Sequence, residues 1–225
     1  MNKPATAPRR SQSERTNAMR LRLIEATVES LAEEGYASST LSAIVRRAGV
    51  SRGAQVHHFP TRQALMIHTA EFLLHETYRE LGRVVLSIAE EDARLDSLVD
   101  ALWRKLFGTR RFTAYMELLA ASQHDALLSQ ELQQLLQRVY ELYRPAADHY
   151  FSRRREGASP TLLFIQLCAL LSGLAAHRHL VIDPTLIDRQ LRLWLDQAAA
   201  QLRARPGVDA PPPMSESRSI DEAAS

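Results

Sequence analysis

Apolar residues recur every three or four positions along most of this 225-residue chain, and polar residues fill the positions between them. This spacing predicts amphipathic helices, because three or four residues return a helix to the same face. The two-residue alternation that is typical of half-buried strands is absent. Leu, Ala, Arg, Glu and Gln are abundant, and all five are good helix formers. We therefore predict an all-α protein.

Turn and helix-breaking residues divide this pattern into segments. The predicted helices cover residues 17–34, 40–48, 52–59, 61–86, 94–107, 110–122, 126–156, 160–181 and 185–204. Gly35 is expected to end the first helix, and Pro145 to kink or divide the helix over 126–156. Residues 1–16 and 206–225 are rich in Pro, Ser and other small or polar residues, which predicts a disordered arm and a disordered tail.

Residues 40–59, TLSAIVRRAGVSRGAQVHHF, have the pattern of two short helices joined by a tight turn. Thr40 and Ser51 each precede a helical run, where a hydroxyl can accept a bond from a free backbone N–H. Gly49 permits the sharp turn, and Val50 can pack the two helices together. This is the layout of a helix-turn-helix, in which the second helix enters the DNA major groove.

The charge distribution agrees with a nucleic-acid-binding head. Residues 1–62 contain 10 Lys or Arg against 5 Asp or Glu, whereas residues 63–225 contain 18 against 21. A basic N-terminal module on an acidic remainder suits a DNA-binding head on a separate body. Chance clustering is the alternative, because the asymmetry is modest.

Composition and motifs exclude several other classes. The single cysteine, Cys168, rules out an intramolecular disulfide and a multi-cysteine zinc site. The polar N-terminus is unlike a signal peptide, and the apolar run over 161–176 is too short and too polar for a membrane span, so we expect a cytoplasmic protein. Phosphate-binding glycine loops, nucleophile elbows and HExxH are absent. We therefore expect neither an enzyme nor a bound cofactor or metal.

Several residues of the N-terminal third form a recognisable pattern. They are Gly35-Tyr36, Thr40, Ile44, Ala48-Gly49-Val50-Ser51, Gly53, His58-Phe59-Pro60 and Leu65. At this spacing they resemble the TetR (tetracycline-repressor-like) family of bacterial transcription regulators over about residues 17–77. Residues 80–205 match that family only in length and helicity.

The resemblance implies an N-terminal three-helix DNA-binding domain over 17–77, with its helix-turn-helix at 40–59. It also implies a helical ligand-binding and dimerisation domain over 78–205, built as a bundle. The expected protein is a homodimeric repressor of a palindromic operator, which a small apolar or amphipathic ligand releases from DNA. A helical small-molecule-binding or scaffold protein with a degenerate DNA-binding head is the alternative.

The last two helices would form the dimer interface in this resemblance. Their sequence agrees, because residues 162–176 are apolar nearly all round and such a helix must be covered on every side. Ala169, Gly173 and Ala176 form a track of small residues that permits close helix approach. A monomeric core is the alternative explanation.

Two residues of the second short helix depart from the family pattern. Gln55 stands where an apolar core residue is expected, so either it is half-buried and hydrogen-bonded or the helix is rotated slightly. Val56 stands where tyrosine is common, and its methyl groups could contact a thymine methyl. Val45 also replaces a more usual alanine in the first short helix.

The candidate DNA-binding residues are Thr40, Ser51, Arg52, Gly53, Ala54, Val56, His57, His58 and Arg62. Arg52, at the start of the second helix, is the strongest candidate for a base or phosphate contact, with a solvated arginine as the alternative. Thr40 and Ser51 can donate to phosphates or act as caps alone. Arg62 is a candidate phosphate clamp. His57 and His58 point about 100° apart on a helix, so we expect no metal site there.

Larger apolar and aromatic residues of the body are candidates for a ligand cavity. They are Trp103, Phe107, Phe112, Tyr115, Met116, Leu119, His124, Tyr140 and His177. Each could instead be an ordinary core residue, because any helical bundle needs apolar residues at this spacing.

Overall fold

The computed structural model describes residues 12–87, 94–154, 157–183 and 185–208. Its elements in chain order are α1 Gln12–Ser38, α2 Leu41–Ala48, α3 Arg52–His58, α4 Arg62–Ser87, α5 Arg94–Leu102, the π-helix η1 Trp103–Phe107, α6 Arg110–Ser122, α7 Ala126–Tyr150, β1 Phe151–Arg153, α8 Pro160–His177, the 3₁₀ helix η2 Arg178–Leu180, α9 Thr185–Gln201 and β2 Leu202–Ala204. The predicted all-α fold is confirmed, with one small sheet added to it.

The predicted helix-turn-helix is confirmed together with the residues that bound it. The Thr40 hydroxyl accepts a bond from Ala43 N at 3.2 Å, and the Ser51 hydroxyl accepts one from Ala54 N at 3.2 Å. Gly49 follows α2 with φ +61° and ψ +39°, the left-handed conformation that glycine adopts most easily. The caps and the turn therefore fix both helix starts and the angle between them.

The first helix is longer than predicted. Helix α1 begins by Gln12, so the prediction of a disordered arm is wrong for residues 12–16. Gly35 is expected to end this helix; instead it interrupts the helical geometry, with φ +78° and ψ +170°, and α1 continues beyond it to Ser38. The rest of the predicted arm, residues 1–11, and most of the predicted tail, residues 209–225, lie outside the described residues.

A short antiparallel sheet replaces the predicted helical ends of two segments. Residues Phe151–Arg153 pair with Leu202–Ala204, with Phe151 opposite Ala204. Beyond the strands, Arg205 N donates to Tyr150 O at 2.9 Å. We name this pairing the β1–β2 clip. Its partners are about 50 residues apart in the chain, and local periodicity does not report such a pairing. Helix α7 itself is undivided at Pro145.

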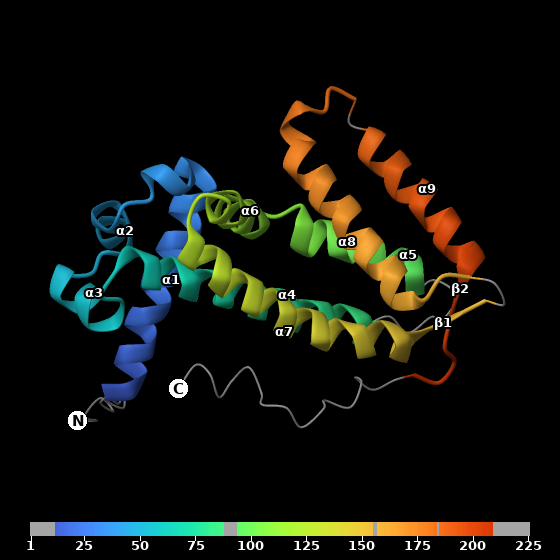
Figure 1. Cartoon of the computed structure of the whole chain (residues 1–225), viewed down its shortest axis with the longest axis horizontal. Helices are drawn as coiled ribbons and strands as arrows, with labels where there is room; N and C mark the ends of the chain where they lie inside the picture. Colours follow the sequence, from blue (N-terminus) through green and yellow to red (C-terminus); the bar gives the residue numbers. More distant parts are fainter. Residues whose placement is uncertain (1–11, 88–93, 155–156, 184, 209–225) are drawn as a thin grey trace, which may run out of the picture.

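Two apolar clusters hold the described part of the molecule together. The first joins α1, α2 and α4 to α6 and α7, together with Phe59 just after α3, and it includes Leu23, Ile44, Leu118 and Leu128. The second joins α5, η1, α8 and α9, and it includes Leu102, Leu167, Leu171, Trp194 and Ala198. The predicted domain boundary after residue 77 lies within α4, and the first cluster continues across it through α6 and α7. Figure 1 shows α2 and α3 at one end of the molecule and α9 at the other.

Helix α8 is the most apolar helix, and only one side of it enters the body core. Leu163 and Leu167 are buried there, whereas Leu162 and Gly173 are exposed. Among the described residues, only the segment Pro160–Leu180 is long and apolar enough to cross a membrane. One such helix is weak evidence for a membrane protein, since an apolar helix in a folded assembly has the same composition.

Candidate DNA-binding surface and ligand cavity

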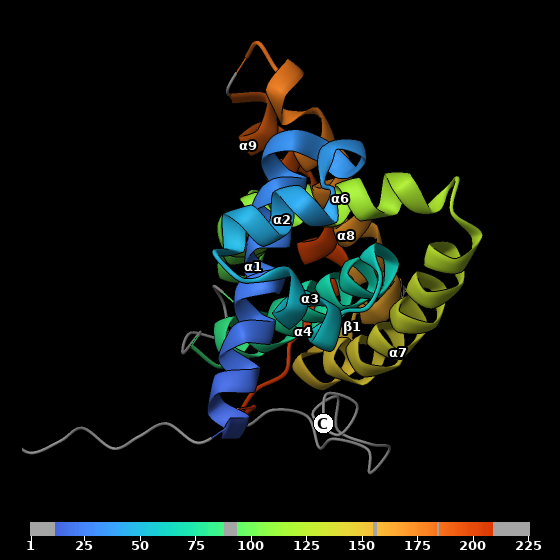
Figure 2. The ribbon, with the colours of Figure 1, turned by 90° about the vertical axis from the view of Figure 1, so that its left-hand side faces the viewer.

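The outer face of α3 is small, partly basic and open to solvent. Arg52, Gly53, Val56 and His57 are exposed, and their spacing places them on one side of the helix. An added methyl group at Gly53 would have no neighbour within 4 Å. Figure 2 looks at this end of the molecule, with α2 and α3 towards the viewer. This face can therefore approach another surface closely.

Gln55 takes the opposite side of α3 and is 2% exposed. Its Nε2 donates to Phe59 O at 2.5 Å. Of the two alternatives from the sequence, the hydrogen-bonded one applies, and the side chain is fully rather than half buried. The polar group is satisfied within its own turn, so α3 keeps the orientation that exposes Val56.

Arginines of the helix-turn-helix region bind α1 and α2 to each other. Arg22 NH2 donates to Ala48 O at 2.6 Å, where the last carbonyls of α2 lack helical partners. Arg47 donates through NH1 to Glu33 at 2.7 Å and through NH2 to Glu34 at 2.5 Å. These bonds fix the first helix of the motif on α1.

Arg62 faces the protein rather than the solvent. Its Nε donates to Ser39 O at 2.8 Å, NH2 donates to Tyr36 O, and the guanidinium carbon lies 4.1 Å from the centroid of the Tyr36 ring. The guanidinium is thus occupied in holding the segment between α1 and α2. This geometry does not support the predicted phosphate clamp, and it makes Arg62 a positioning residue.

The remaining predicted DNA-binding residues lie around the same face. The hydroxyls of Thr40 and Ser51 are exposed and cap their helices. Ala54 and His58 are half-buried. Partial burial lowers the pKa of His58, and the neighbouring His57 and Arg20 lower it further.

A cavity of about 1000 Å³ lies in the body between α4, α6, α7 and α8, and α5 and η1 also contribute to its wall. The predicted ligand residues Phe107, Phe112, Tyr115, Leu119 and Tyr140 line it. Four other predicted residues do not line it, and they are Trp103, Met116, His124 and His177. Trp103 packs against the body core. His177 is exposed, with Nδ1 2.8 Å from Gly173 O.

The cavity wall is mainly apolar and aromatic, with a few polar groups. Burial raises the pKa of the Tyr115 hydroxyl and raises that of the Cys168 thiol to about 12, so both stay protonated at neutral pH. The thiol is therefore a poor nucleophile. Charged residues that the sequence argument missed also contribute to the wall, among them Glu76, Glu80 and Arg111. Their helical spacing alone suggests a solvated face, which is why periodicity did not identify them.

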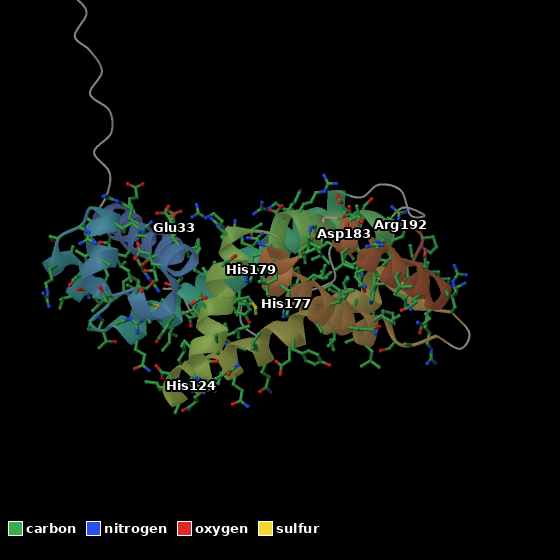
Figure 3. All side chains as sticks on the ribbon, turned by 90° about the horizontal axis from the view of Figure 1, so that it is seen from above. Glu33, His124, His177, His179, Asp183 and Arg192 are labelled. Carbon is green, nitrogen blue, oxygen red and sulfur yellow. The ribbon has the colours of Figure 1, made fainter. Side chains whose placement is uncertain are left out.

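The head and the cavity are joined through α1 and α6. Tyr36 N, at the end of α1, donates to Glu117 Oε2 of α6 at 2.9 Å. Arg110, the first residue of α6, donates to Glu33 of α1 at 2.5 Å. Figure 3 labels Glu33 on the head. Because α6 also supplies part of the cavity wall, a change in the cavity has a direct structural path to the helix-turn-helix.

A third surface is formed by α8 and α9, away from the helix-turn-helix. Large apolar side chains are exposed there, with 61% of Leu162 and 53% of Leu193 accessible. Gly173 lies on the same side of α8 as Leu162, and an added methyl group there would meet nothing within 4 Å. By contrast, Leu191, Trp194 and Ala198 of α9 are buried in the chain's own core.

Comparisons of sequence agree with this geometry. Residues 23–69 match the profile of a family described as bacterial regulatory proteins, tetR family. The chain is 35% identical over 131 residues to the HTH-type transcriptional regulator CymR of Pseudomonas putida, covering 58% of this chain and 64% of that protein. It is 28% identical over 188 residues to an uncharacterised HTH-type transcriptional regulator of Mycobacterium bovis, covering 81% of this chain and 93% of the relative.

Comparisons of structure show the same fold over most of the chain. A TetR transcription regulator from Haloarcula marismortui superimposes with a TM-score of 0.63 at 18% identity, covering 83% of this chain and all of that one. A putative transcriptional regulator from Saccharomonospora viridis, solved in complex with choline, has a TM-score of 0.63 at 18% identity, covering 86% of this chain and all of that one.

Proposed function

We propose that this chain, like the tetR-family regulators that it resembles, is a DNA-binding transcriptional regulator, and that it acts as a homodimeric repressor of a palindromic operator controlled by a small ligand. The observation that carries the proposal is the path from the cavity to the helix-turn-helix. Helix α6 lines the cavity and is bonded to α1, and α1 holds α2 through Arg22 and Arg47. A ligand in the cavity can thus alter how the heads are placed.

We propose that the outer face of α3 enters the major groove. Arg52 is the main base or phosphate contact, because it is exposed at the start of the helix. Gly53 and Ala54 allow the backbone to approach the bases, and Val56 and His57 complete the face. The proposed supporting phosphate contacts are the capping hydroxyls of Thr40 and Ser51 and the half-buried side chain of His58.

The proposed dimer uses the exposed α8–α9 surface. Two copies related by a two-fold axis would cover Leu162 and Leu193 and would bring Gly173 close to its partner helix. A stable interface buries about 800 Å² on each partner, and an apolar helix with one open side supplies surface of this kind. Two-fold symmetry then predicts two half-sites about 34–36 Å apart, or a multiple of that distance.

The proposed ligand is a small apolar or amphipathic molecule that occupies the cavity, with Phe107, Tyr115, Leu119 and Tyr140 among its contacts. A volume of about 1000 Å³ lies at the upper end of the usual range for small-molecule sites. The neighbour from Saccharomonospora viridis was solved with choline, so a quaternary ammonium is included among the probes below. We place the protein in the cytoplasm with its DNA, and the proposal includes no catalytic step.

A gel-shift titration tests this function. The target is the intergenic DNA flanking the protein's own gene, and unrelated DNA is the competitor. A discrete band that resists competition, at a specificity ratio of at least about 10³, would support operator binding. A smear that the competitor abolishes would contradict it, and would favour a small-molecule-binding or scaffold protein with a degenerate head.

Arg52→Ala tests the proposed contact within that assay. Operator binding should weaken by about 1–3 kcal/mol while the dimer stays intact. Arg104→Ala is the matched control, because Arg104 is exposed on η1 and is paired with Asp100. Unchanged affinity in Arg52→Ala would remove Arg52 from the DNA-binding surface.

A further inference from the structure

Arg110 takes part in both the cavity wall and the support of the helix-turn-helix. It is the first residue of α6 and contributes to the wall. Its NH2 donates to Glu33 Oε1 at 2.5 Å, and the other oxygen of Glu33 accepts a bond from Arg47 NH1 of α2 at 2.7 Å. One carboxylate of α1 therefore joins the cavity wall to the first helix of the helix-turn-helix.

The charged part of the wall carries an excess of positive charge among the described residues. Four basic side chains contribute to it, and they are Arg83, Lys105, Arg110 and Arg111. Two acidic side chains contribute, and each of them is shared between two bases. Glu76 pairs with Arg79 and Arg111, and Glu80 pairs with Arg83 and Lys105.

Arg110 differs from the other bases because its carboxylate partner, Glu33, lies outside the wall. Arg110 and Arg111 also begin α6, where the helix dipole disfavours cations and favours a nearby anion. An anion in the cavity would therefore meet surplus positive charge beside Arg110, whereas a cation would have to compete for carboxylates that are already shared.

We propose that the cavity takes an amphipathic anion, with an apolar body and a carboxylate or similar head, and that Arg110 binds this head in competition with Glu33. This inference rests on the proposed function and names the ligand class and the residue that senses it. The apolar body lies against the aromatic wall. The anionic group of the ligand draws the Arg110 guanidinium away from α1. Glu33 is then bonded to Arg47 alone, and the N-terminus of α6 is released from the DNA-binding domain.

The exposure of this relay suits a reversible switch. Glu33 and Arg110 are both accessible, with 37% and 68% of their side chains exposed, and exposed ion pairs contribute little to stability. A ligand can therefore displace Glu33 without unfolding the head. Hydrogen bonds from Arg47 and Arg110 keep the pKa of Glu33 below its ordinary value, so the carboxylate is ionised at neutral pH.

The test uses the full protein and three probes that each carry a ten-carbon chain and differ in their polar groups. They are decanoate, decanamide and decyltrimethylammonium. Each competes with the neutral fluorophore N-phenyl-1-naphthylamine for the cavity, and each is added to the complex with operator DNA. We expect decanoate to displace the dye at roughly tenfold lower concentration than decanamide, as one charge-assisted bond allows, and to release DNA.

Three variants and a control separate ligand sensing from folding. Arg110→Ala should weaken decanoate binding by roughly tenfold and leave decanamide unchanged. Glu33→Gln should tighten decanoate binding, because it removes the carboxylate that competes for Arg110, but should reduce the effect of decanoate on DNA affinity by at least about fivefold. Arg110→Lys keeps the charge without the fork of donors and should weaken decanoate binding less than Arg110→Ala does. Arg104→Ala is the control for loss of an exposed arginine.

The other possible results contradict either the inferred ligand class or the proposed function, and the two cases can be told apart. Preferential binding of decyltrimethylammonium, equal binding of decanoate and decanamide, or normal decanoate binding by Arg110→Ala would overturn the inference. Release of DNA by decyltrimethylammonium would also overturn the inference. It would nevertheless support the proposed function, because a ligand would still control DNA binding. Failure of the unliganded protein to bind any operator would contradict the proposed function, and the dye competition would still decide the ligand class.

Discussion

At the scale of single residues, Gln55 shows how a departure from an expected pattern is accommodated. The sequence places a polar side chain where α3 needs to pack against α1, and it leaves two explanations open. In the structure the side chain is buried and its amide donates to Phe59 O. The choice depends on a bond four residues further along the chain, which hydrophobic periodicity does not encode. Buried amides are tolerated when their donors are satisfied in this way.

Replacing this amide by an acid should be strongly destabilising. In Gln55→Glu a carboxylate would face the Phe59 carbonyl in a buried position, with the donor lost. We expect the free energy of unfolding to fall by more than about 2 kcal/mol, and the fall for Gln55→Leu to be smaller, about 1–2 kcal/mol. Urea unfolding followed by circular dichroism measures both. Equal losses in the two variants would contradict the importance of the buried donor.

His58 should make stability depend on pH. Its pKa in the folded protein lies below the ordinary value of 6.5, mainly because of burial. The unfolded chain therefore takes up this proton first, so stability falls as the pH drops below about 6.5. His58→Gln should lose less free energy of unfolding between about pH 7.5 and about pH 5.5 than the natural chain does. The comparison is urea unfolding at the two values.

His124→Gln provides the control for this pH effect, because His124 is exposed in the turn before α7. If His58→Gln kept the full pH dependence, another group would have to account for it.

At the scale of elements, sequence reasoning succeeded where a local signal marks a boundary. Hydroxyl caps and Gly49 located α2 and α3 to within a residue. It failed where distant contacts decide. The β1–β2 clip, for example, pairs segments far apart in the chain. Arg62 shows the same limit, because the two carbonyls that bind it come from the preceding segment around Ser39.

Gly53→Ala should separate the stability of α3 from its contact with DNA. Alanine favours helix over glycine, and the position has open space around it, so the free energy of unfolding should rise by about 0.5–1 kcal/mol. The added methyl group would stand between the helix backbone and the bases, so operator affinity should fall. Thermal unfolding and gel shifts measure the two effects. A gain in stability with unchanged affinity would show that Gly53 does not face DNA.

Gly49→Ala serves as the counterpart. Gly49 has φ +61°, and a methyl group there would lie 3.1 Å from Arg22 NH2. This variant should lose about 1–2 kcal/mol of stability instead of gaining it.

At the scale of the whole molecule, the sequence predicted the existence of a helical body but not which of its residues surround the cavity. Tyr115 and Leu119 line it, whereas Met116 on the same helix does not. Apolar residues at helical spacing are needed equally for a core and for a cavity, so their pattern alone cannot separate the two. The charged wall residues went unnoticed for the complementary reason, since charge at helical spacing is usual on a solvated face.

Gly173→Leu should disrupt the proposed dimer without disturbing the fold of one chain. The position has open space in the single chain, so a leucine clashes only when a second copy lies against α8. We expect the dimer dissociation constant to rise at least about tenfold. Sedimentation velocity measures it, with Ala18→Leu as the control because Ala18 is exposed on α1. A stable Gly173→Leu dimer would show that α8 is not the interface.

The β1–β2 clip closes the stretch between residues 151 and 204 into a loop. It brings the start and the end of this stretch together at one point, through Phe151 opposite Ala204 and the bond from Arg205 to Tyr150. Helices α8 and α9 are therefore carried on a closed loop that leaves the rest of the chain and returns to it at the same place. In the proposed dimer this loop would carry both interface helices as one unit, so replacing it would change the interface and leave the DNA-binding head unchanged.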